Sequence, residues 1–122
     1  MMIQLYHNPR CSKSRETLAL LEQIASEQQL SLEVIDYQKT PLTLEQLQTL
    51  LTQLGGDVQA MLRPNEEEYS AASLADADSL RALQAIVTTP KLLQRPIVSY
   101  RGQAVIARPP ELALGLFQKV NQ

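Results

Sequence analysis

The residue with the clearest chemical potential in this sequence is its single cysteine. Cys11 lies in the basic segment Asn8-Pro9-Arg10-Cys11-Ser12-Lys13-Ser14-Arg15, and no acidic residue precedes Glu16. Cationic neighbours and a helix N-terminus lower the pKa of a cysteine into the reactive range. A lone cysteine is more often an inert core residue. Here the surrounding residues favour a nucleophilic thiolate.

Other polar groups near Cys11 are candidates for supporting roles. Backbone N–H groups and small hydroxyl residues leading into a helix could hold a tetrahedral oxyanion beside the sulfur. Ser14 could donate a hydrogen bond to the thiolate, but serine at such a position also serves as a helix cap. Arg15 adds positive charge. His7 could stabilise the thiolate as an imidazolium, although packing or hydrogen bonding in the loop is its more ordinary role.

Three arginines further along the chain share an unusual context. Arg63, Arg95 and Arg108 each follow a stretch that contains apolar residues, and each directly precedes a proline. An arginine in apolar sequence at a strand edge is costly unless its guanidinium meets an anion. The planar guanidinium binds oxyanions and carboxylates with paired hydrogen bonds, so such a partner would explain these three arginines. Composition alone would assign each to the surface, because arginine is rarely buried.

Several classes of function are excluded or disfavoured. One cysteine permits neither an internal disulfide nor a Cys-x-x-Cys couple, so redox chemistry would need an external thiol. One cysteine and one histidine make a metal site unexpected. The net charge of −2 and the lack of a long basic run argue against broad binding to nucleic acid or membranes. With no signal-like or membrane-spanning run, we expect a cytoplasmic protein.

The N-terminal part of the chain has the pattern of a βαβ unit. Residues 3–6 form a short apolar run that ends at His7-Asn8-Pro9, which predicts a strand leading into a loop. From Ser12 to about residue 29, apolar residues recur at helical spacing. A second strand over residues 32–36 follows. We therefore expect two parallel strands joined by a helix, with Cys11 at the helix start.

The rest of the chain predicts a helical segment, a hairpin and a closing helix. Thr43 and Gln46 have capping-box spacing before a leucine-rich helix. A second helix ends at Thr89-Pro90, and residues 66–68 form an acidic turn between the two. Residues 96–100 and 104–106 flank Arg101-Gly102 as a β-hairpin. Pro109-Pro110 opens a last helix that runs through Leu112 and Leu116 to Val120.

These elements predict an α/β fold with one thioredoxin-like domain over residues 1–122. Its centre is a four-stranded mixed sheet, and the helical segment at about 43–89 is an insertion. A chain of 122 residues suits one compact domain.

The segment from Tyr6 to Arg15 resembles the signature of the glutaredoxin-coupled arsenate reductase family. Later blocks resemble that family in order and approximate spacing, so the likeness covers nearly the whole chain. These blocks are Asp36-Tyr37, Leu62-Arg63 with Asn65-Glu66, Arg95-Pro96-Ile97-Val98, and Arg108-Pro109 with Glu111.

The resemblance implies a nucleophilic Cys11 and an oxyanion held by Arg63, Arg95 and Arg108. It also implies a cis peptide bond before Pro96. In the family's reaction the thiolate attacks arsenate, glutathione attacks the adduct, and glutaredoxin resolves the mixed disulfide as arsenite leaves. The partners implied are therefore arsenate or a similar oxyanion, glutathione as co-substrate, and glutaredoxin. No bound cofactor is expected.

A second function stays open. Relatives with the same fold act as transcription regulators or adaptors that bind a protein partner, usually with a Cys-x-x-Cys switch. Residue 14 is serine here, so that switch is absent. Ser12-Lys13 also stands where well-known arsenate reductases have a smaller, glycine-containing sequence. An adaptor has no need for a cysteine paired with three arginines, and this separates the two hypotheses.

Overall fold

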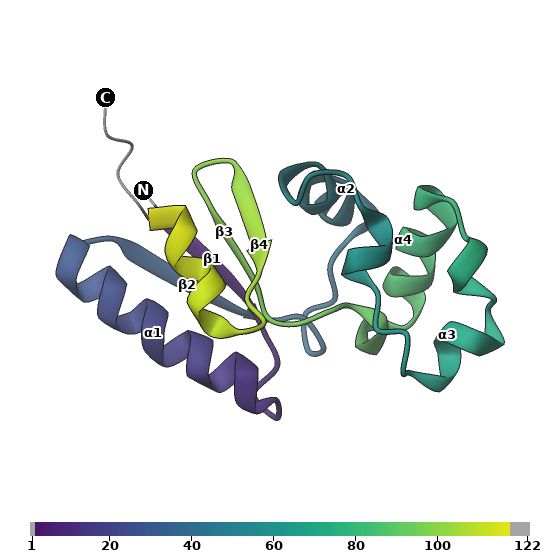
Figure 1. Cartoon of the computed structure of the whole chain (residues 1–122), viewed down its shortest axis with the longest axis horizontal. Helices are drawn as coiled ribbons and strands as arrows, with labels where there is room; N and C mark the ends of the chain where they lie inside the picture. Colours follow the sequence, from purple (N-terminus) through teal and green to yellow (C-terminus); the bar gives the residue numbers. More distant parts are fainter. Residues whose placement is uncertain (1, 118–122) are drawn as a thin grey trace. The chain divides into compact units, whose positions relative to one another are not determined.

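The computed structural model describes residues 2–117, and these form two compact units. The first unit contains the segments up to Ile35 and from Arg95 onward, and the second contains Asp36–Gln94. Figure 1 gives the element labels. The helical insertion predicted at 43–89 falls within the second unit. Among the described residues, no helix has the length and apolar character that crossing a membrane requires.

The first unit is built on a four-stranded sheet. Its elements are β1 (Met2–His7), α1 (Ser12–Gln28), β2 (Ser31–Asp36), β3 (Ile97–Tyr100), β4 (Gln103–Ile106) and the 3-10 helix η4 (Pro110–Phe117). The strand order is β2-β1-β3-β4. β3 pairs antiparallel with β1 and with β4. The pairing of β1 with β3 joins the predicted βαβ unit to the predicted hairpin in one sheet. The predicted α/β fold with a mixed four-stranded sheet is confirmed.

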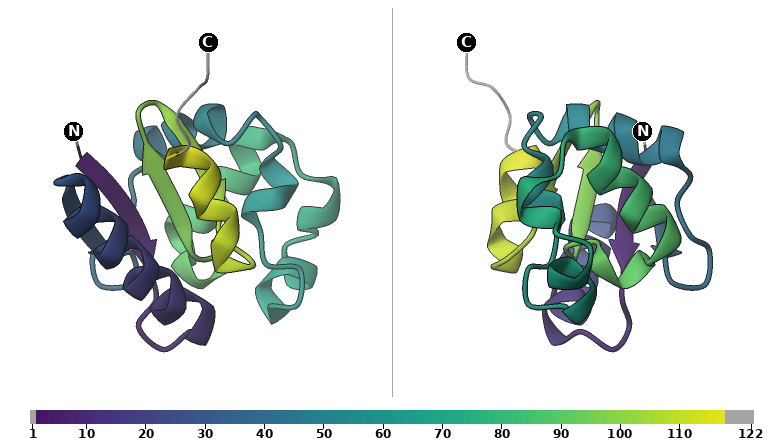
Figure 2. Two further views of the ribbon diagram at one scale, coloured as in Figure 1. Left: turned by 60° about the vertical axis from the view of Figure 1, so that its left-hand side comes forward. Right: turned by 90° about the vertical axis from the view of Figure 1, so that its right-hand side faces the viewer.

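One face of this sheet is covered by α1 and η4, which lie side by side in Figures 1 and 2. Alternating residues of β1 and β3 point into the core between them, because successive strand residues face opposite sides. The buried cluster consists of Ile3, Leu5, Leu21, Ile24, Val98, Tyr100, Ala107 and Ala113. This packing fixes α1, and hence its first turn, against the end of β1.

The second unit is helical. It contains α2 (Leu44–Gln53), η1 (Val58–Met61), α3 (Glu67–Ala71), η2 (Leu74–Asp76), α4 (Ser79–Thr88) and η3 (Pro90–Leu92). The predicted capping box starts α2: the Thr43 hydroxyl accepts from the Gln46 N–H, and the Gln46 side chain accepts from the Thr43 N–H. Helix α4 packs against α2, η1 and η3.

Two predicted elements differ from the structure. Residues 66–68, predicted as an acidic turn, are the N-cap and the first two residues of the short helix α3. The last helix is a 3-10 helix over Pro110–Phe117, and its predicted continuation to Val120 lies outside the described residues. Gly115 lies inside this segment and disfavours regular α-helix, which weakens i to i+4 bonding there.

Leu21 tests the packing that holds α1 on the sheet. Its side chain is fully buried in the cluster of the first unit. Leu21→Ala leaves a cavity there, so we expect the free energy of unfolding to fall by about 2–5 kcal/mol in urea denaturation. Leu112, which is 50% exposed on η4, is the matched control. Leu112→Ala should change stability by about 0.5 kcal/mol or less, and equal losses would contradict the packing described.

Candidate active site

Cys11 is the N-cap residue of α1 and has extended backbone angles, φ −96° and ψ 124°. Its side chain is partly buried. The unpaired N–H groups of a first helical turn carry partial positive charge, which stabilises an anion at this position. The sequence prediction that Cys11 opens the first helix is confirmed.

Asn8 gives the loop before Cys11 its shape. Its backbone carbonyl accepts from the Cys11 N–H at 3.0 Å, which closes a four-residue turn with Pro9 in the second position, where proline is favoured. Its side-chain Oδ1 accepts from the Arg10 N–H, also at 3.0 Å. Asn8 is 5% exposed. Sequence reasoning missed this residue, although asparagine before proline is a turn signal that points to it.

Ser14 joins this loop to the end of β1. Its hydroxyl oxygen accepts from the Asn8 N–H at 3.0 Å and lies 3.0 Å from Nδ1 of His7. When the imidazole is neutral, the hydroxyl can donate its own proton to Nδ1. Ser14 and His7 are both buried. The Ser14 hydroxyl is thus hydrogen-bonded to His7 and Asn8. The sequence suggested a bond from this hydroxyl to the Cys11 sulfur instead. His7 is linked to the loop through Ser14.

Strand register explains why two distant arginines reach Cys11. Tyr6 of β1 pairs with Ile97 of β3, so the loop after β1 lies beside the segment before β3. Ile97 in turn pairs with Ile106, and the Ala107 N–H donates to the Pro96 carbonyl at 2.9 Å. The residues just outside these pairs, Arg95 and Arg108, therefore lie together at the open end of the hairpin, next to Cys11.

Both guanidinium groups act on the Cys11 thiol. Nη1 of Arg108 lies 3.9 Å from Sγ of Cys11 and donates to the backbone carbonyl of Arg95 at 3.1 Å. The Arg95 side chain lies near enough to lower the pKa of the Cys11 thiol by hydrogen bonding and by its charge. Arg95 is half-buried and Arg108 is exposed. The cis peptide bond expected before Pro96 is present, and a second one precedes Pro109.

The pKa of the Cys11 thiol is lowered from its ordinary value. Burial is the largest single influence and raises this pKa, because it disfavours the charged form. Hydrogen bonds from the Ser14 backbone, the Arg95 side chain and the Lys13 backbone, together with the Arg95 charge, lower it by more. A larger thiolate fraction near neutral pH follows, as the sequence predicted from the basic loop.

Two other arginines named from the sequence have different surroundings. Arg15 is exposed, and its Nη1 donates to the Pro9 carbonyl at 2.9 Å, so it braces the loop. Arg63 belongs to the second unit, where its Nη1 donates to Oε1 of Gln94 at 3.3 Å and its backbone N–H donates to the Leu92 carbonyl. Its predicted convergence on Cys11 stays a prediction.

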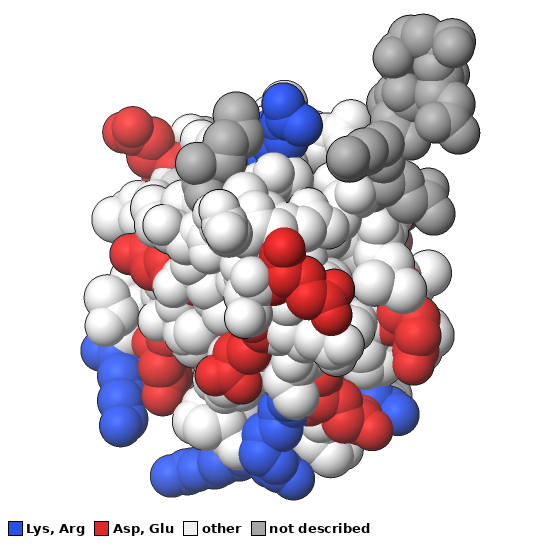
Figure 3. Space-filling view, turned by 90° about the vertical axis from the view of Figure 1, so that its left-hand side faces the viewer, with Lys and Arg blue, Asp and Glu red and all other residues white. Residues whose placement is uncertain are grey.

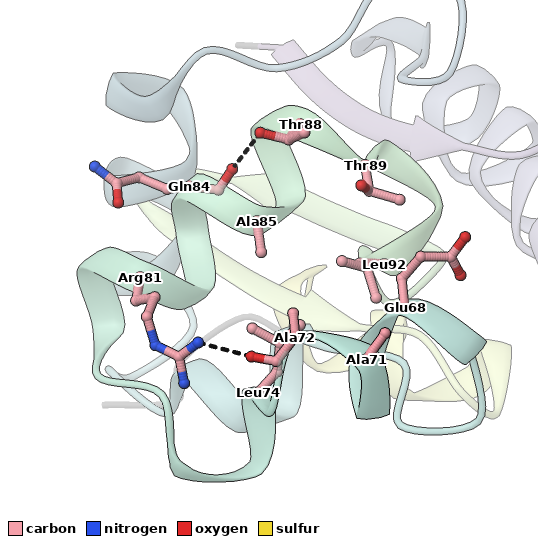
Figure 4. Close-up of a pocket in the computed structure, with 10 residues that line it drawn as sticks. All are labelled: Glu68, Ala71, Ala72, Leu74, Arg81, Gln84, Ala85, Thr88, Thr89 and Leu92. Carbon is pink, nitrogen blue, oxygen red and sulfur yellow. Dashed lines mark hydrogen bonds between the residues drawn. The ribbon is translucent and has the colours of Figure 1, made fainter.

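The second unit contains a pocket of about 460 Å³, shown in Figure 4. None of the site residues named from the sequence lines it. Arg81 at its rim donates to the Ala72 and Ser73 carbonyls, and Glu68 is paired with Lys91 at 2.7 Å. Its charged groups are thus already engaged in structural bonds. The described residues also contain no group of three or more potential metal ligands. The candidate active site is therefore the Cys11 loop.

A thiol of lowered pKa, with backbone N–H donors and two guanidiniums close to it, forms a site suited to binding anions. Comparisons with known proteins agree with this class. The ArsC family model matches residues 6–115, so the chain belongs to the ArsC family. The solved structure of an arsenate reductase from Vibrio cholerae superposes with a TM-score of 0.86 at 44% identity, covering 95% of this chain and 98% of that one. The predicted thioredoxin-like fold is thereby confirmed.

Sequence relatives cover nearly the full length as well. A protein of Escherichia coli K12 named YfgD, described as uncharacterized, is 46% identical over 92% of this chain and 93% of its own. An arsenate reductase of Neisseria meningitidis (strain Z2491) is 39% identical over 89% of this chain and 92% of its own. The family resemblance seen in the sequence is confirmed.

Ser14→Ala tests the network that shapes the loop. Removing the hydroxyl leaves the buried Asn8 N–H without its acceptor, so we expect a loss of about 1–3 kcal/mol in the free energy of unfolding. The Ser14 backbone N–H should also be aimed less well at the sulfur, which would raise the pKa of Cys11. Urea denaturation and the pH dependence of alkylation measure the two effects. Ser12→Ala, at an exposed position one residue into α1, is the control and should change neither.

The lowered pKa of Cys11 can be tested directly by alkylation. The rate of reaction with iodoacetamide, followed against pH, should show a midpoint below the usual cysteine value of about 8.5. Arg95→Gln removes a positive charge and a hydrogen bond from the thiolate, so the midpoint should move upward. Arg101→Gln, at the turn of the hairpin, should leave it in place. A wild-type midpoint at or above 8.5 would show that Cys11 is not activated.

Proposed function

We propose that this protein reduces arsenate, or a similar oxyanion, to arsenite through a covalent adduct on Cys11, with glutathione and glutaredoxin as external reductants. The observation that supports it best is the guanidinium of Arg108, 3.9 Å from the Cys11 sulfur and beside Arg95. A relative in Neisseria meningitidis and a structural neighbour in Vibrio cholerae are named arsenate reductases. The proposed activity is therefore that of an oxidoreductase.

The first step would use the groups around the sulfur. The Cys11 thiolate attacks arsenic, an S–As bond forms, and one oxygen leaves as water after protonation. Negative charge moves from the sulfur to the arsenate oxygens during this step. Arg108 already contacts the sulfur and carries several N–H donors, so it can follow the charge with little movement. Arg95 and Arg63 would supply the remaining contacts to the oxyanion.

The second half of the reaction needs a thiol from outside the chain. Reduction of arsenic from the +5 to the +3 state takes two electrons, which two thiols supply when they form one disulfide. Cys11 is the only cysteine in the chain, so glutathione would attack the adduct, releasing arsenite and leaving a mixed disulfide at Cys11. Glutaredoxin would then reduce this disulfide. Because the scheme requires a reducing glutathione pool, we place the protein in the cytoplasm.

The adaptor hypothesis receives less support from the site. A protein that only binds a partner has no use for a cysteine whose pKa is held down by an arginine side chain and two helix N–H groups. Perturbed pKa values of this kind are concentrated at catalytic sites. The proposed enzyme accounts for Cys11, Arg95 and Arg108 together.

An NADPH-linked assay of arsenate reduction with glutathione, glutaredoxin and glutathione reductase tests the proposal. The wild-type protein should turn over, and Cys11→Ser should be inactive. A parallel assay replaces the glutathione components with thioredoxin and its reductase. Turnover with thioredoxin alone would contradict the glutaredoxin coupling, and arsenate reduction by Cys11→Ser would contradict the covalent mechanism.

The same assay measures the contribution of the arginines. Loss of a charge-assisted hydrogen bond costs about 1.5–3 kcal/mol, so Arg95→Ala or Arg108→Ala should lower kcat/KM by about 10- to 150-fold. Lysine at either position keeps the charge but loses the paired donors, so it should restore only part of the activity. Arg63→Ala tests its predicted role. Arg101→Ala, an exposed cation at the hairpin turn, is the control, and equal activity in all variants would refute the oxyanion site.

A further inference from the structure

We propose that Arg10 is a specificity-determining residue that makes Cys11 react preferentially with thiols and disulfides bearing carboxylates. This inference rests on the proposed function, because it concerns the external thiol that the reaction requires. It adds a basis for selecting that thiol, which the oxyanion-binding arginines do not provide.

The surroundings of Cys11 are cationic although the chain as a whole is not. The net charge of the chain is −2. Three segments meet at Cys11, residues 8–16, 95–97 and 107–111, and the carboxylates in their sequence are Glu16 and Glu111. Figure 3 shows most of its Lys and Arg side chains along the lower edge of the molecule, with Asp and Glu side chains directly above them. The cations of these segments are Arg10, Lys13, Arg15, Arg95 and Arg108.

Most of these cations are already engaged in the described structure. Arg108 lies against the Cys11 sulfur, Arg95 lowers the pKa of its thiol, and Arg15 donates to the Pro9 carbonyl. Lys13 is paired with Glu16, with Nζ 3.5 Å from Oε2. Arg10 differs from them. It is exposed, and within residues 2–117 its guanidinium takes part in no ion pair.

The backbone holds Arg10 next to the sulfur. Its N–H donates to Oδ1 of Asn8, and the following residue is Cys11, whose N–H closes the turn on the Asn8 carbonyl. Successive Cα atoms are about 3.8 Å apart. The Arg10 side chain is therefore anchored one residue before Cys11, and its charge can act on molecules that come within the Debye length of about 10 Å in 0.1 M salt.

A charge in this position acts on molecules that approach from solvent. In thiol–disulfide exchange, the Cys11 thiolate attacks one sulfur of the incoming disulfide, the old S–S bond breaks, and the other sulfur leaves as a thiolate. Partly exposed Cys11 permits this attack. Arg10 would attract an anionic disulfide and repel a cationic one. Arsenate is also an anion, but it would contact Arg95 and Arg108 directly. A thiol peptide is larger, so it would extend beyond these two arginines and come close to Arg10.

The experiment compares disulfides of different charge with the reduced full-length protein. Oxidised glutathione is anionic, bis(2-hydroxyethyl) disulfide is neutral and cystamine is cationic. Second-order rate constants for mixed-disulfide formation at Cys11 are measured at pH 7 by intact mass, in about 20 mM and about 500 mM salt. The readout is the ratio of the oxidised glutathione rate to the cystamine rate. The same thiolate attacks both disulfides, so a change in the pKa of Cys11 cancels from this ratio.

Arg10→Gln should lower the ratio by about fivefold in low salt, the size expected for a screened charge acting across water. High salt should bring the wild-type ratio close to that of Arg10→Gln. The control is Arg101→Gln, which removes an exposed cation from the opposite end of the β3–β4 hairpin and should keep the wild-type ratio.

Two negative results have separate meanings. An unchanged ratio in Arg10→Gln would overturn the role of Arg10 while leaving the proposed function intact. Failure of Cys11 to react with any of the three disulfides would overturn the external-thiol scheme and, with it, the selectivity inferred here.

Discussion

The negative charge of a partly buried thiolate is the constraint on which this site depends. Burial alone would keep Cys11 protonated, since removing an anion from water is unfavourable. The compensating groups are two N–H donors from the first turn of α1 and the side chain of Arg95. Because each of them must point at one sulfur atom, the loop, the helix start and the hairpin end all have to be fixed relative to Cys11.

Two separate parts of the fold meet this requirement. A local network of Asn8, Ser14 and His7 sets the path of the chain into α1. The β1–β3 and β3–β4 registers place Arg95 and Arg108 beside it, and a shift of one residue in either ladder would turn the facing side chains to the opposite side of the sheet. The leucine and isoleucine core under α1 serves the site indirectly, because it prevents such shifts.

The sequence predicted the features that depend on neighbouring residues. The capping box at Thr43 and Gln46, the hairpin turn at Arg101-Gly102 and the helix start at Cys11 are all local signals. Arg95 and Arg108 could be connected with Cys11 only through the family resemblance, since strand register is a long-range property. The direction of the Ser14 hydroxyl and the three hydrogen bonds of Asn8 could not be predicted, because they depend on the three-dimensional path of the loop. The helix α3 has five residues, too few for hydrophobic periodicity to distinguish it from a turn.

The buried position of Ser14 also constrains how this redox chemistry could change. Residue 14 is one helical turn beyond the reactive cysteine, the position that a second cysteine occupies in a Cys-x-x-Cys pair. Here its side chain is fully buried and bonded to the Asn8 N–H and to His7. A thiol is a much weaker acceptor and donor than a hydroxyl. Serine at position 14 anchors the loop, whereas cysteine there could form an internal disulfide with Cys11. One side chain cannot do both, so a rigid anion site and an internal second thiol are competing uses of this position.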